Sequence, residues 1–415
     1  MMIKNNRIRQ LPRNIWVLTG GSFLTDISSE MIVHLIPLFL ANVVGVGTVA
    51  IGLIEGVAET TASLLKIISG RLSDKLGQRK WLTVAGYGLS TLAKPFLVVA
   101  QSWTAVFGVR FADRVGKGIR TAPRDALVAD SIDAKNRGLA FGLHRAGDTA
   151  GAAVGLLTAL IVVGLAQGDK LTLQAATFRT LVWMSVIPAI LAVILLAVGI
   201  HETPLKQSKI GAAQKLSWRD LNRPFKRYLL VVTLFTLGNS SDAFLILRAQ
   251  ERGLSVLGVM ALLLAFNVVY AAVSGPASAL SDRIGRRWLL TVGWLAYAMI
   301  YAGFALAQTA VHIWLLFGLY GVYYGLTEGS AKAFVADLSL PEQRGTAYGL
   351  FNAAIGLAAL PASLFAGLLW QGIGNWTGFG PSAPFWFGAI LALAATGLLF
   401  ALRLETGNLR VELGD

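Results

Sequence analysis

One stretch occurs twice in this chain, as GRLSDKLGQRK at residues 70–80 and as SALSDRIGRR at residues 278–287. Each copy lies between long apolar segments and carries Leu-Ser-Asp followed three residues later by glycine. Two shorter stretches return at almost the same offset: Val128–Asp130 as Val335–Asp337, and Arg137–Leu143 as Arg344–Leu350. A repeat at a fixed offset indicates a duplicated architecture.

The composition indicates a membrane protein. Hydrophobic residues make up 55% of the chain and charged residues only 14%, which is too apolar for an ordinary soluble domain. A helix needs about 20 apolar residues to cross the hydrocarbon core of a bilayer. Twelve segments of about this length can be read, at residues 15–41, 48–69, 81–101, 104–127, 138–165, 178–200, 227–247, 254–279, 288–308, 312–336, 345–370 and 382–402. We therefore expect an all-α membrane protein.

The repeat divides the twelve spans into two sets of six. The first set is expected to form an N-terminal six-helix bundle at residues 1–201, and the second a C-terminal bundle at residues 228–415. The polar stretch 202–227 is predicted to be a cytoplasmic linker. Duplicated membrane proteins are usually transporters whose binding sites lie near the bilayer midplane.

The basic residues, which give a net charge of +14, gather in alternate loops. The loops rich in Lys and Arg are 70–80, 203–227, 283–287 and 403–410. The loops with neither residue are 42–47, 101–103 and 371–381. This asymmetry follows the positive-inside rule and predicts that both termini are cytoplasmic. Nucleic acid is therefore not an expected partner, and a patch for anionic lipid is a second interpretation of the linker.

Several other kinds of protein are disfavoured. The chain has no cysteine, so neither a disulfide nor a thiolate metal site is available. It has no HExxH, GxSxG or phosphate-binding loop motif, which argues against an enzyme and against an ATP-driven pump. No cofactor and no metal are expected. A metal ion held by His34 with Asp26 and Glu30 is a minor alternative, because groups four residues apart on a helix can share an ion.

The repeated loop resembles the signature of the major facilitator superfamily. Its pattern, Gly-x-Leu-x-Asp-x-x-Gly-x-Arg, follows the second of twelve spans and recurs after the eighth. The stretch Arg114–Ala122, RVGKGIRTA, is similar to the Arg-x-x-x-Gly signature of the superfamily's fourth span. The resemblance covers essentially the whole chain. It implies a monomeric secondary transporter with two pseudo-symmetric six-helix bundles, in a bacterial inner (cytoplasmic) membrane.

Glycines of the fifth span suggest a subfamily. Their positions match the spacing of a motif that marks drug/proton antiporters of the superfamily: Gly138, Gly147, Gly151 and Gly155. Ala152 stands where that motif has proline. The resemblance implies proton-coupled efflux. Glycines at this spacing also allow close helix packing in any membrane protein, and this second interpretation stays open.

The repeated loop is expected to be a conformational latch. In each copy an aspartate ends a helix, and a glycine then lets the chain turn sharply. The resemblance implies a cytoplasmic latch whose contacts form only while that side is shut. The predicted latch residues are Gly70, Asp74, Gly77, Arg79, Asp282, Gly285 and Arg287. The alternative is that the basic residues only retain the loop in the cytoplasm.

Ionisable residues inside the spans are functional candidates, because each costs roughly 2.5 to 3.5 kcal/mol to insert at the bilayer centre. Asp26, Glu30 and His34 lie four apart, so they share one face of the first span. The predicted proton-coupling residues are Asp26, Glu30, Arg114, Asp148 and Asp242. The predicted substrate-binding residues are Arg110, Lys117, His144, Arg145, Asn267, Tyr324, Glu328 and Asn352.

Specific pairings are expected among these residues. Asp26 and Glu30 would face Arg114, the position that the resemblance ties to proton transfer. Asp148 would pair with Arg145 or with a cation of the fourth span. Aligning Ser28-Ser29-Glu30 with Ser240-Ser241-Asp242 makes Asp242 the repeat partner of Glu30, and Glu328 would pair with Lys332 one turn on. The alternative is that such pairs only hold helices together.

Proton-coupled export of a small organic molecule is the leading hypothesis. Burial among apolar helices disfavours the charged form of a carboxylate, and a nearby arginine favours it, so rocking helices can switch proton binding. The alternatives are a proton symporter that imports an organic anion, favoured by the excess of cations in the first half, and a lipid or lysolipid transporter. The expected partners are the organic substrate, protons and the lipid bilayer.

Overall fold

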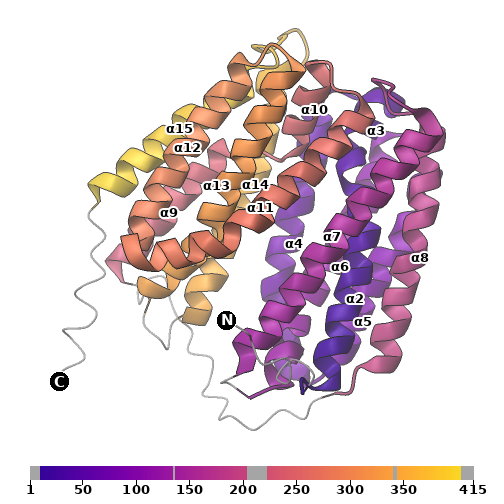
Figure 1. The fold of residues 1–415 in the computed structure, drawn as a ribbon, viewed down its shortest axis with the longest axis vertical. Helices are drawn as coiled ribbons and strands as arrows, with labels where there is room; N and C mark the ends of the chain where they lie inside the picture. The colour runs from indigo at the N-terminus through magenta and orange to yellow at the C-terminus, as the bar shows by residue number, and fades with distance from the viewer. Residues whose placement is uncertain (1–9, 134–135, 203–221, 340–343, 403–415) are drawn as a thin grey trace. The chain divides into compact units, whose positions relative to one another are not determined.

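The computed structural model describes residues 10–133, 136–202, 222–339 and 344–402. These residues are helical apart from short connections and one isolated β-bridge between Ile373 and Trp376 (Figure 1). The predicted all-α class is confirmed. Most of the predicted linker, and the basic stretch 403–410, lie outside the described residues.

The first half of the chain forms the helices that build the candidate site. They are α2 (Arg13–Glu30), η1 (Val33–Leu35), α3 (Ile36–Phe39), η2 (Leu40–Val44), α4 (Thr48–Leu76), α5 (Lys80–Ala93), η3 (Lys94–Val98), α6 (Trp103–Asp130), α7 (Arg137–Gln167) and α8 (Ala175–Gly199). The pieces α2 to η2 together make the first span, which is broken after Glu30.

The second half repeats this plan. Its helices are α9 (Arg223–Gly238), α10 (Ala243–Glu251), α11 (Val256–Ile284), α12 (Arg286–Leu306), α13 (Ala310–Asp337), α14 (Arg344–Gln371) and α15 (Ala383–Ala401). Here α9 and α10 together make the seventh span, which is broken between residues 238 and 243. Each of the twelve predicted spans therefore corresponds to a helix or to a broken helix.

Ten helical segments of the described chain are long and apolar enough to cross a membrane. The third and fourth predicted spans are not among them, for two reasons. The continuous part of the third span, α5, has only 14 residues. The fourth span, α6, carries seven charged residues between positions 110 and 125. Such a density of charge is not compatible with a surface that faces lipid.

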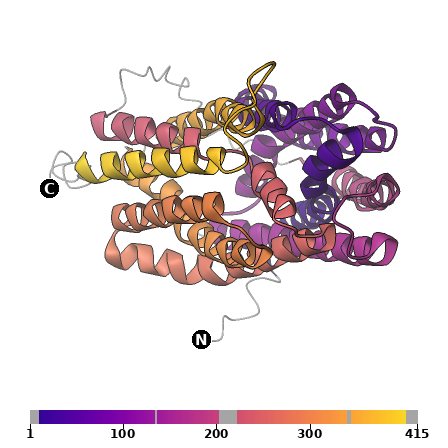
Figure 2. The same ribbon diagram turned by 90° about the horizontal axis from the view of Figure 1, so that it is seen from above.

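The chain packs as two compact units. One comprises residues 1–46, 61–209 and 255–260, and the other comprises residues 47–60, 210–254 and 261–415. Within the first unit α2, α5, α6, α7 and α8 share one general direction, as Figures 1 and 2 both show.

The first unit is held together by close contact between α2 and α7. Glycines of α7 lie against the backbone of α2: a Cβ at Gly151 would meet the carbonyl oxygen of Phe23, and one at Gly155 would lie 2.6 Å from that of Ile27. The glycine spacing of the fifth span therefore serves helix packing in this structure.

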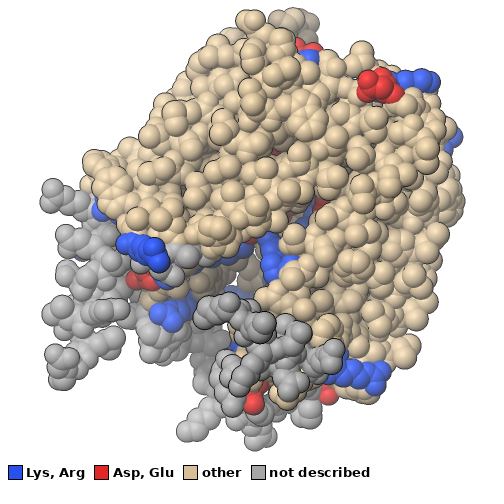
Figure 3. Space-filling view, viewed as in Figure 1, with Lys and Arg blue, Asp and Glu red and all other residues tan. Residues whose placement is uncertain are grey.

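The outer side of α8 is apolar. Its exposed side chains include Trp183, Ile187, Ile190, Leu191, Ile194 and Val198. In Figure 3 the flank where α7 and α8 lie is tan along its middle, and charged residues lie near its two ends. An exposed apolar face of this length fits contact with lipid tails.

Candidate functional site

A polar cavity lies inside the first unit, between α2, η3 and α6, and encloses about 120 Å³. A cavity in a helical bundle is normally lined by apolar side chains with a few polar ones. Eight charged side chains line this one: Asp26, Glu30, Lys94, Arg110, Asp113, Arg114, Lys117 and Arg120. The structure thus brings Asp26, Glu30 and Arg114 together, as their positions in the sequence predict.

The break in the first span places Glu30 at this cavity. Pro37 has no N–H to donate to the carbonyl group of Val33, and this missing hydrogen bond favours a kink or a break in the helix. The regular helix α2 ends at Glu30, and a tight 3₁₀ turn follows. Glu30 Oε2 lies 2.9 Å from Nε2 of His34, so the carboxylate already has a partner on its own span.

Asp26 differs from Glu30 in its surroundings. It lies one turn earlier on α2 and lines the same cavity. Within the described residues Asp26 forms no hydrogen bond and no ion pair. Of the two predicted proton-coupling acids on the first span, Asp26 is therefore the one without a direct partner among the described residues.

Helix α6 supplies the cations. Arg110 is buried and lies 3.9 Å from Asp113. Arg120 Nη1 donates to Ser90 Oγ over 2.6 Å, and its guanidinium lies 4.5 Å from the centre of the Tyr87 ring. These contacts are possible because Gly116 on α6 lies against the backbone of α5. The signature around Arg114 therefore combines charge with close packing.

Lys94 is a site residue that the sequence analysis missed. Pro95 interrupts α5, and the narrower helix η3 begins at Lys94. The side chain is buried, lines the cavity and donates to the hydroxyl groups of Ser28 and Ser29. A lysine beside a proline inside an apolar span is a signal that the sequence does contain.

The expected pair between Asp148 and Arg145 is wrong. Asp148 Oδ2 lies 3.5 Å from His144 Nδ1, one turn earlier on α7. Arg145 is exposed, whereas His144 is buried. Residues three and four apart on a helix are both neighbours, so spacing alone could not decide between the two. Asp148 Oδ1 and His144 Nε2 are buried and have no hydrogen-bond partner in the described structure.

In the second unit, Asp242 lies at the break between α9 and α10. The break follows a run of weak helix formers, Gly238 to Ser241. The hydroxyl group of Tyr297 donates to the freed carbonyl group of Gly238 over 3.2 Å. Tyr320 donates to Asp242 Oδ1 over 3.0 Å. Glu30 and Asp242, which the repeat aligns, therefore both lie where their spans are broken.

The other candidates of the second unit lie on α11, α13 and α14. Glu328 forms the expected pair with Lys332, at 3.0 Å, and also accepts a hydrogen bond from Tyr270 over 2.5 Å. Asn267 donates to the Leu263 carbonyl group of its own helix over 3.0 Å. Tyr324 packs among aromatic rings, and Asn352 is exposed.

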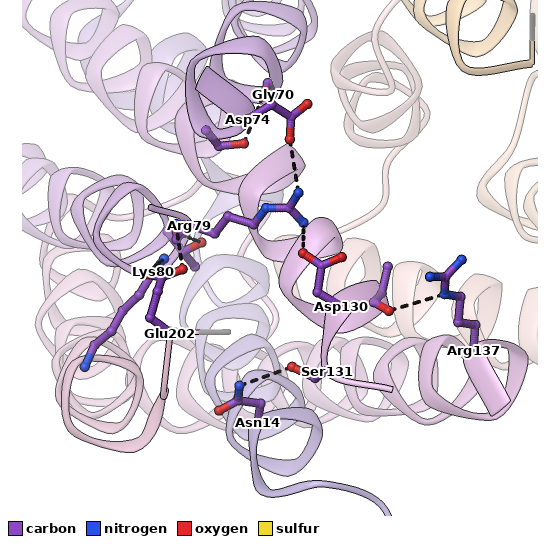
Figure 4. A network of polar contacts seen from close by, with 12 residues as sticks. Asn14, Gly70, Asp74, Arg79, Lys80, Asp130, Ser131, Arg137 and Glu202 are labelled. Carbon is purple, nitrogen blue, oxygen red and sulfur yellow. Dashed lines mark hydrogen bonds and ion pairs between the residues drawn. The ribbon is translucent and has the colours of Figure 1, made fainter. Parts of the chain in front are cut away.

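The first copy of the repeated loop forms a network of its own (Figure 4). Gly77 has a φ of +65°, which a sharp turn after α4 requires. Arg79 donates to Asp74 over 3.1 Å and to Asp130 at the end of α6. The carboxylate of Glu202 accepts from the backbone N–H of Arg79 over 2.9 Å. The loop therefore joins the ends of α4 and α6 to the segment that follows α8.

The second copy makes equivalent links with different residues. Gly285 has a φ of +90°. Arg286 pairs with Asp337, the repeat partner of Asp130, whereas Arg287 donates to the carbonyl group of Phe400 over 2.5 Å. The sequence alignment pointed to Arg287 for this role and missed Arg286. The predicted latch residue Asp282 lies outside the described side chains.

No group of three metal-ligating side chains occurs in the described parts of the chain. His34 is the hydrogen-bond partner of Glu30, as described above.

The comparison of the whole chain with protein families identifies its class. The sequence model of the Major Facilitator Superfamily matches residues 18–266 and 228–412. The chain belongs to this superfamily. It is therefore an integral membrane protein and a secondary transporter that works by alternating access, and the family is not one of enzymes.

Two relatives in the superfamily are similar over most of the chain. An uncharacterized MFS-type transporter of Methanocaldococcus jannaschii, MJ1317, is 37% identical over 95% of this chain and 96% of its own length. The multi-drug resistance efflux pump PmrA of Streptococcus pneumoniae is 25% identical over 76% of this chain and 78% of its own.

Solved structures of the superfamily share the fold. The crystal structure of a D-xylose-proton symporter matches 95% of this chain and 98% of its own, with a TM-score of 0.76 and 15% identity. The predicted superfamily fold, with twelve spans in two repeats, is thus confirmed.

Proposed function

We propose that this superfamily member is a proton-coupled exporter of small organic molecules. The observation that carries the proposal is Asp26, a carboxylate that lines a cavity with five cations and has no hydrogen bond or ion pair among the described residues. Ionisable groups inside a membrane span mark ion and proton pathways by default. A neutral Asp26 would carry the proton, and the nearby cations would favour its release.

The other acids would play different parts. Glu30 is engaged by His34, so we propose that it changes partner during the cycle rather than carrying the proton alone. Arg114 lines the same cavity and would attract whichever acid is ionised. Asp148 and Asp242 are proposed as further members of the proton route. Asp148 pairs with the buried His144, and Asp242 lies at the break before α10.

Export is supported by the printed function of one relative, the efflux pump PmrA. The glycines of α7 match the spacing of an antiporter motif, but their close packing on α2 explains that spacing without reference to direction. The proposal of export therefore rests on the similarity to PmrA.

Uptake of an organic anion with a proton is the second candidate. It is favoured by the charges around the cavity, where five cations face three carboxylates. Such an excess attracts negatively charged molecules.

We also propose that the repeated loops form a cytoplasmic latch, with both termini in the cytoplasm and the protein in a bacterial inner membrane as a monomer. The link from Arg79 to Asp130 supports a latch, because it ties the ends of two helices through one side chain. Two of the proposed substrate-binding residues, Arg110 and Lys117, line the cavity.

Direction can be tested in proteoliposomes that hold the protein in both orientations, with one orientation blocked by an impermeant reagent at an engineered external cysteine. The chain has no cysteine of its own, so labelling is specific. A proton-coupled exporter should move substrate in the direction opposite to the flow of protons. Accumulation of substrate on the side to which protons flow would instead establish uptake.

A further inference from the structure

We infer that Lys94 is a binding residue for the anionic group of the transported molecule. This inference rests on the transport function proposed above and names the class of substrate: an organic molecule with a carboxylate or a phosphate group. The position of Lys94 in the folded chain is the basis for this role, since Lys94 belongs to none of the charged motifs of the sequence.

Lys94 is buried and charged, yet the groups that accept its hydrogen bonds in the described structure are neutral. Only 4% of the residue is exposed, and it lines the cavity of the first unit. Its hydrogen bonds go to the hydroxyl groups of Ser28 and Ser29. No carboxylate forms an ion pair with it among the described residues. A buried ammonium group is costly unless it is paired with an opposite charge, so this site favours the arrival of an anion.

The two hydroxyl groups hold the ammonium group in place. Ser28 is fully buried and donates its own proton to the carbonyl group of Ser185 over 2.5 Å. Its oxygen is thus available to Lys94 as an acceptor, and Ser29 accepts a second bond over 3.3 Å. An ammonium group has three donors, so these two bonds leave one for a ligand. Helices α2 and α8 therefore orient Lys94 before any ligand arrives.

The charges around Lys94 reinforce its selectivity. The cavity has five cations and three carboxylates, and two of the carboxylates have other partners. Glu30 interacts with His34, and Asp113, which also attracts Lys94, lies 3.9 Å from Arg110. The remaining field is positive, and it repels amines while it attracts anions.

The cavity has room for an anionic group. Its volume of about 120 Å³ is several times the ~10–15 Å³ that one water molecule needs on the same measure. A carboxylate or phosphate group therefore fits beside Lys94, and we assign the cavity to this group of the substrate.

The test measures thermal unfolding of the purified full-length protein in detergent with benzoate, phenyl phosphate, benzyl alcohol and benzylamine. A ligand that binds the folded state raises the melting temperature, and the rise grows with the logarithm of its concentration divided by Kd. We expect benzoate or phenyl phosphate to stabilise the protein, and the neutral alcohol and the amine to have no effect. The better of the two anions distinguishes a carboxylate from a phosphate substrate.

Variants then assign the effect to Lys94. Lys94→Met keeps an unbranched side chain of similar length without the charge, and should weaken anion binding roughly thirtyfold or more. Lys94→Arg restores a positive charge and should recover much of the binding. Arg179→Gln removes an exposed cation of α8 as a matched control, and should bind the anion like the wild type.

Two results would overturn the inference: equal stabilisation of wild type and Lys94→Met, or no stabilisation of the wild type by either anion. The second result does not depend on how well any variant folds. If neither anion stabilises the wild type but proteoliposomes transport a neutral or cationic compound, the inference about Lys94 is wrong and the proposed export still holds. Absence of any transport would remove both proposals.

Discussion

Arg79 forms an ion pair with Asp130, which lies 51 residues further along the chain at the end of α6. The Arg79 side chain is only 11% exposed and that of Asp130 is 30% exposed, so this pair is partly shielded from water. Its second partner, Asp74, is 68% exposed. Arg79 thus forms one half-buried ion pair, with Asp130, and one exposed ion pair, with Asp74.

Asp130→Asn is expected to destabilise the first unit by about 1–2 kcal/mol, between the values for exposed and for buried ion pairs. Asp74→Asn should leave stability and expression unchanged but slow transport, because the exposed Asp74 would act in the latch. Thermal unfolding in detergent and initial rates in proteoliposomes measure the two effects. Normal turnover of Asp74→Asn would remove the latch hypothesis.

The second copy of the loop gives a matched pair of variants. Arg286→Gln loses the ion pair with Asp337 and a bond to the Ala333 carbonyl group. Arg287→Gln loses one bond to the Phe400 carbonyl group. We therefore expect Arg286→Gln to lower the melting temperature more than Arg287→Gln. The opposite order would mean that the sequence alignment, and not the observed contact, identifies the arginine that matters.

Asp26→Asn should uncouple transport from protons. The amide cannot exchange a proton, so exchange of labelled for unlabelled substrate should persist while uptake driven by a pH gradient is lost. Glu30→Gln is the comparison, because Glu30 already has His34 as a partner, and it should reduce both activities by a similar factor. If Asp26→Asn keeps gradient-driven transport, Asp26 is not the proton carrier.

Gly151→Ala tests the contact between α7 and α2. The added methyl group would meet the Phe23 carbonyl oxygen, and overpacking of this kind typically costs about 1–3 kcal/mol. Gly142→Ala on the same helix is the control, since its methyl group would meet nothing within 4 Å. It should leave stability equal or slightly higher, because alanine favours helix over glycine. Equal melting temperatures for the two variants would contradict the packing.

The sequence predicted the fold well because apolar length and the repeated loop are local signals. It also aligned Glu30 with Asp242, and both lie at broken helices. The breaks themselves were not predicted, since hydropathy continues through them. Pro37 and the run from Gly238 to Ser241 carried that information.

The candidate site was predicted less completely, because partners on different helices cannot be read from spacing along one helix. Spacing along one helix is not decisive either, because Asp148 pairs with His144 instead of Arg145 although both lie within one turn of it on α7. Lys94 was missed because it is isolated in its own span, and its partners Ser28 and Ser29 are on α2.

The most direct test of the account is proton movement across proteoliposomes that contain the protein and a pH-sensitive dye, with organic acids, amines and lipophilic drugs added in turn. The account predicts that one class of compound triggers a proton flux in the wild type, and that Asp26→Asn abolishes the flux while substrate exchange continues. Measurable substrate transport with no proton movement in the wild type would contradict it.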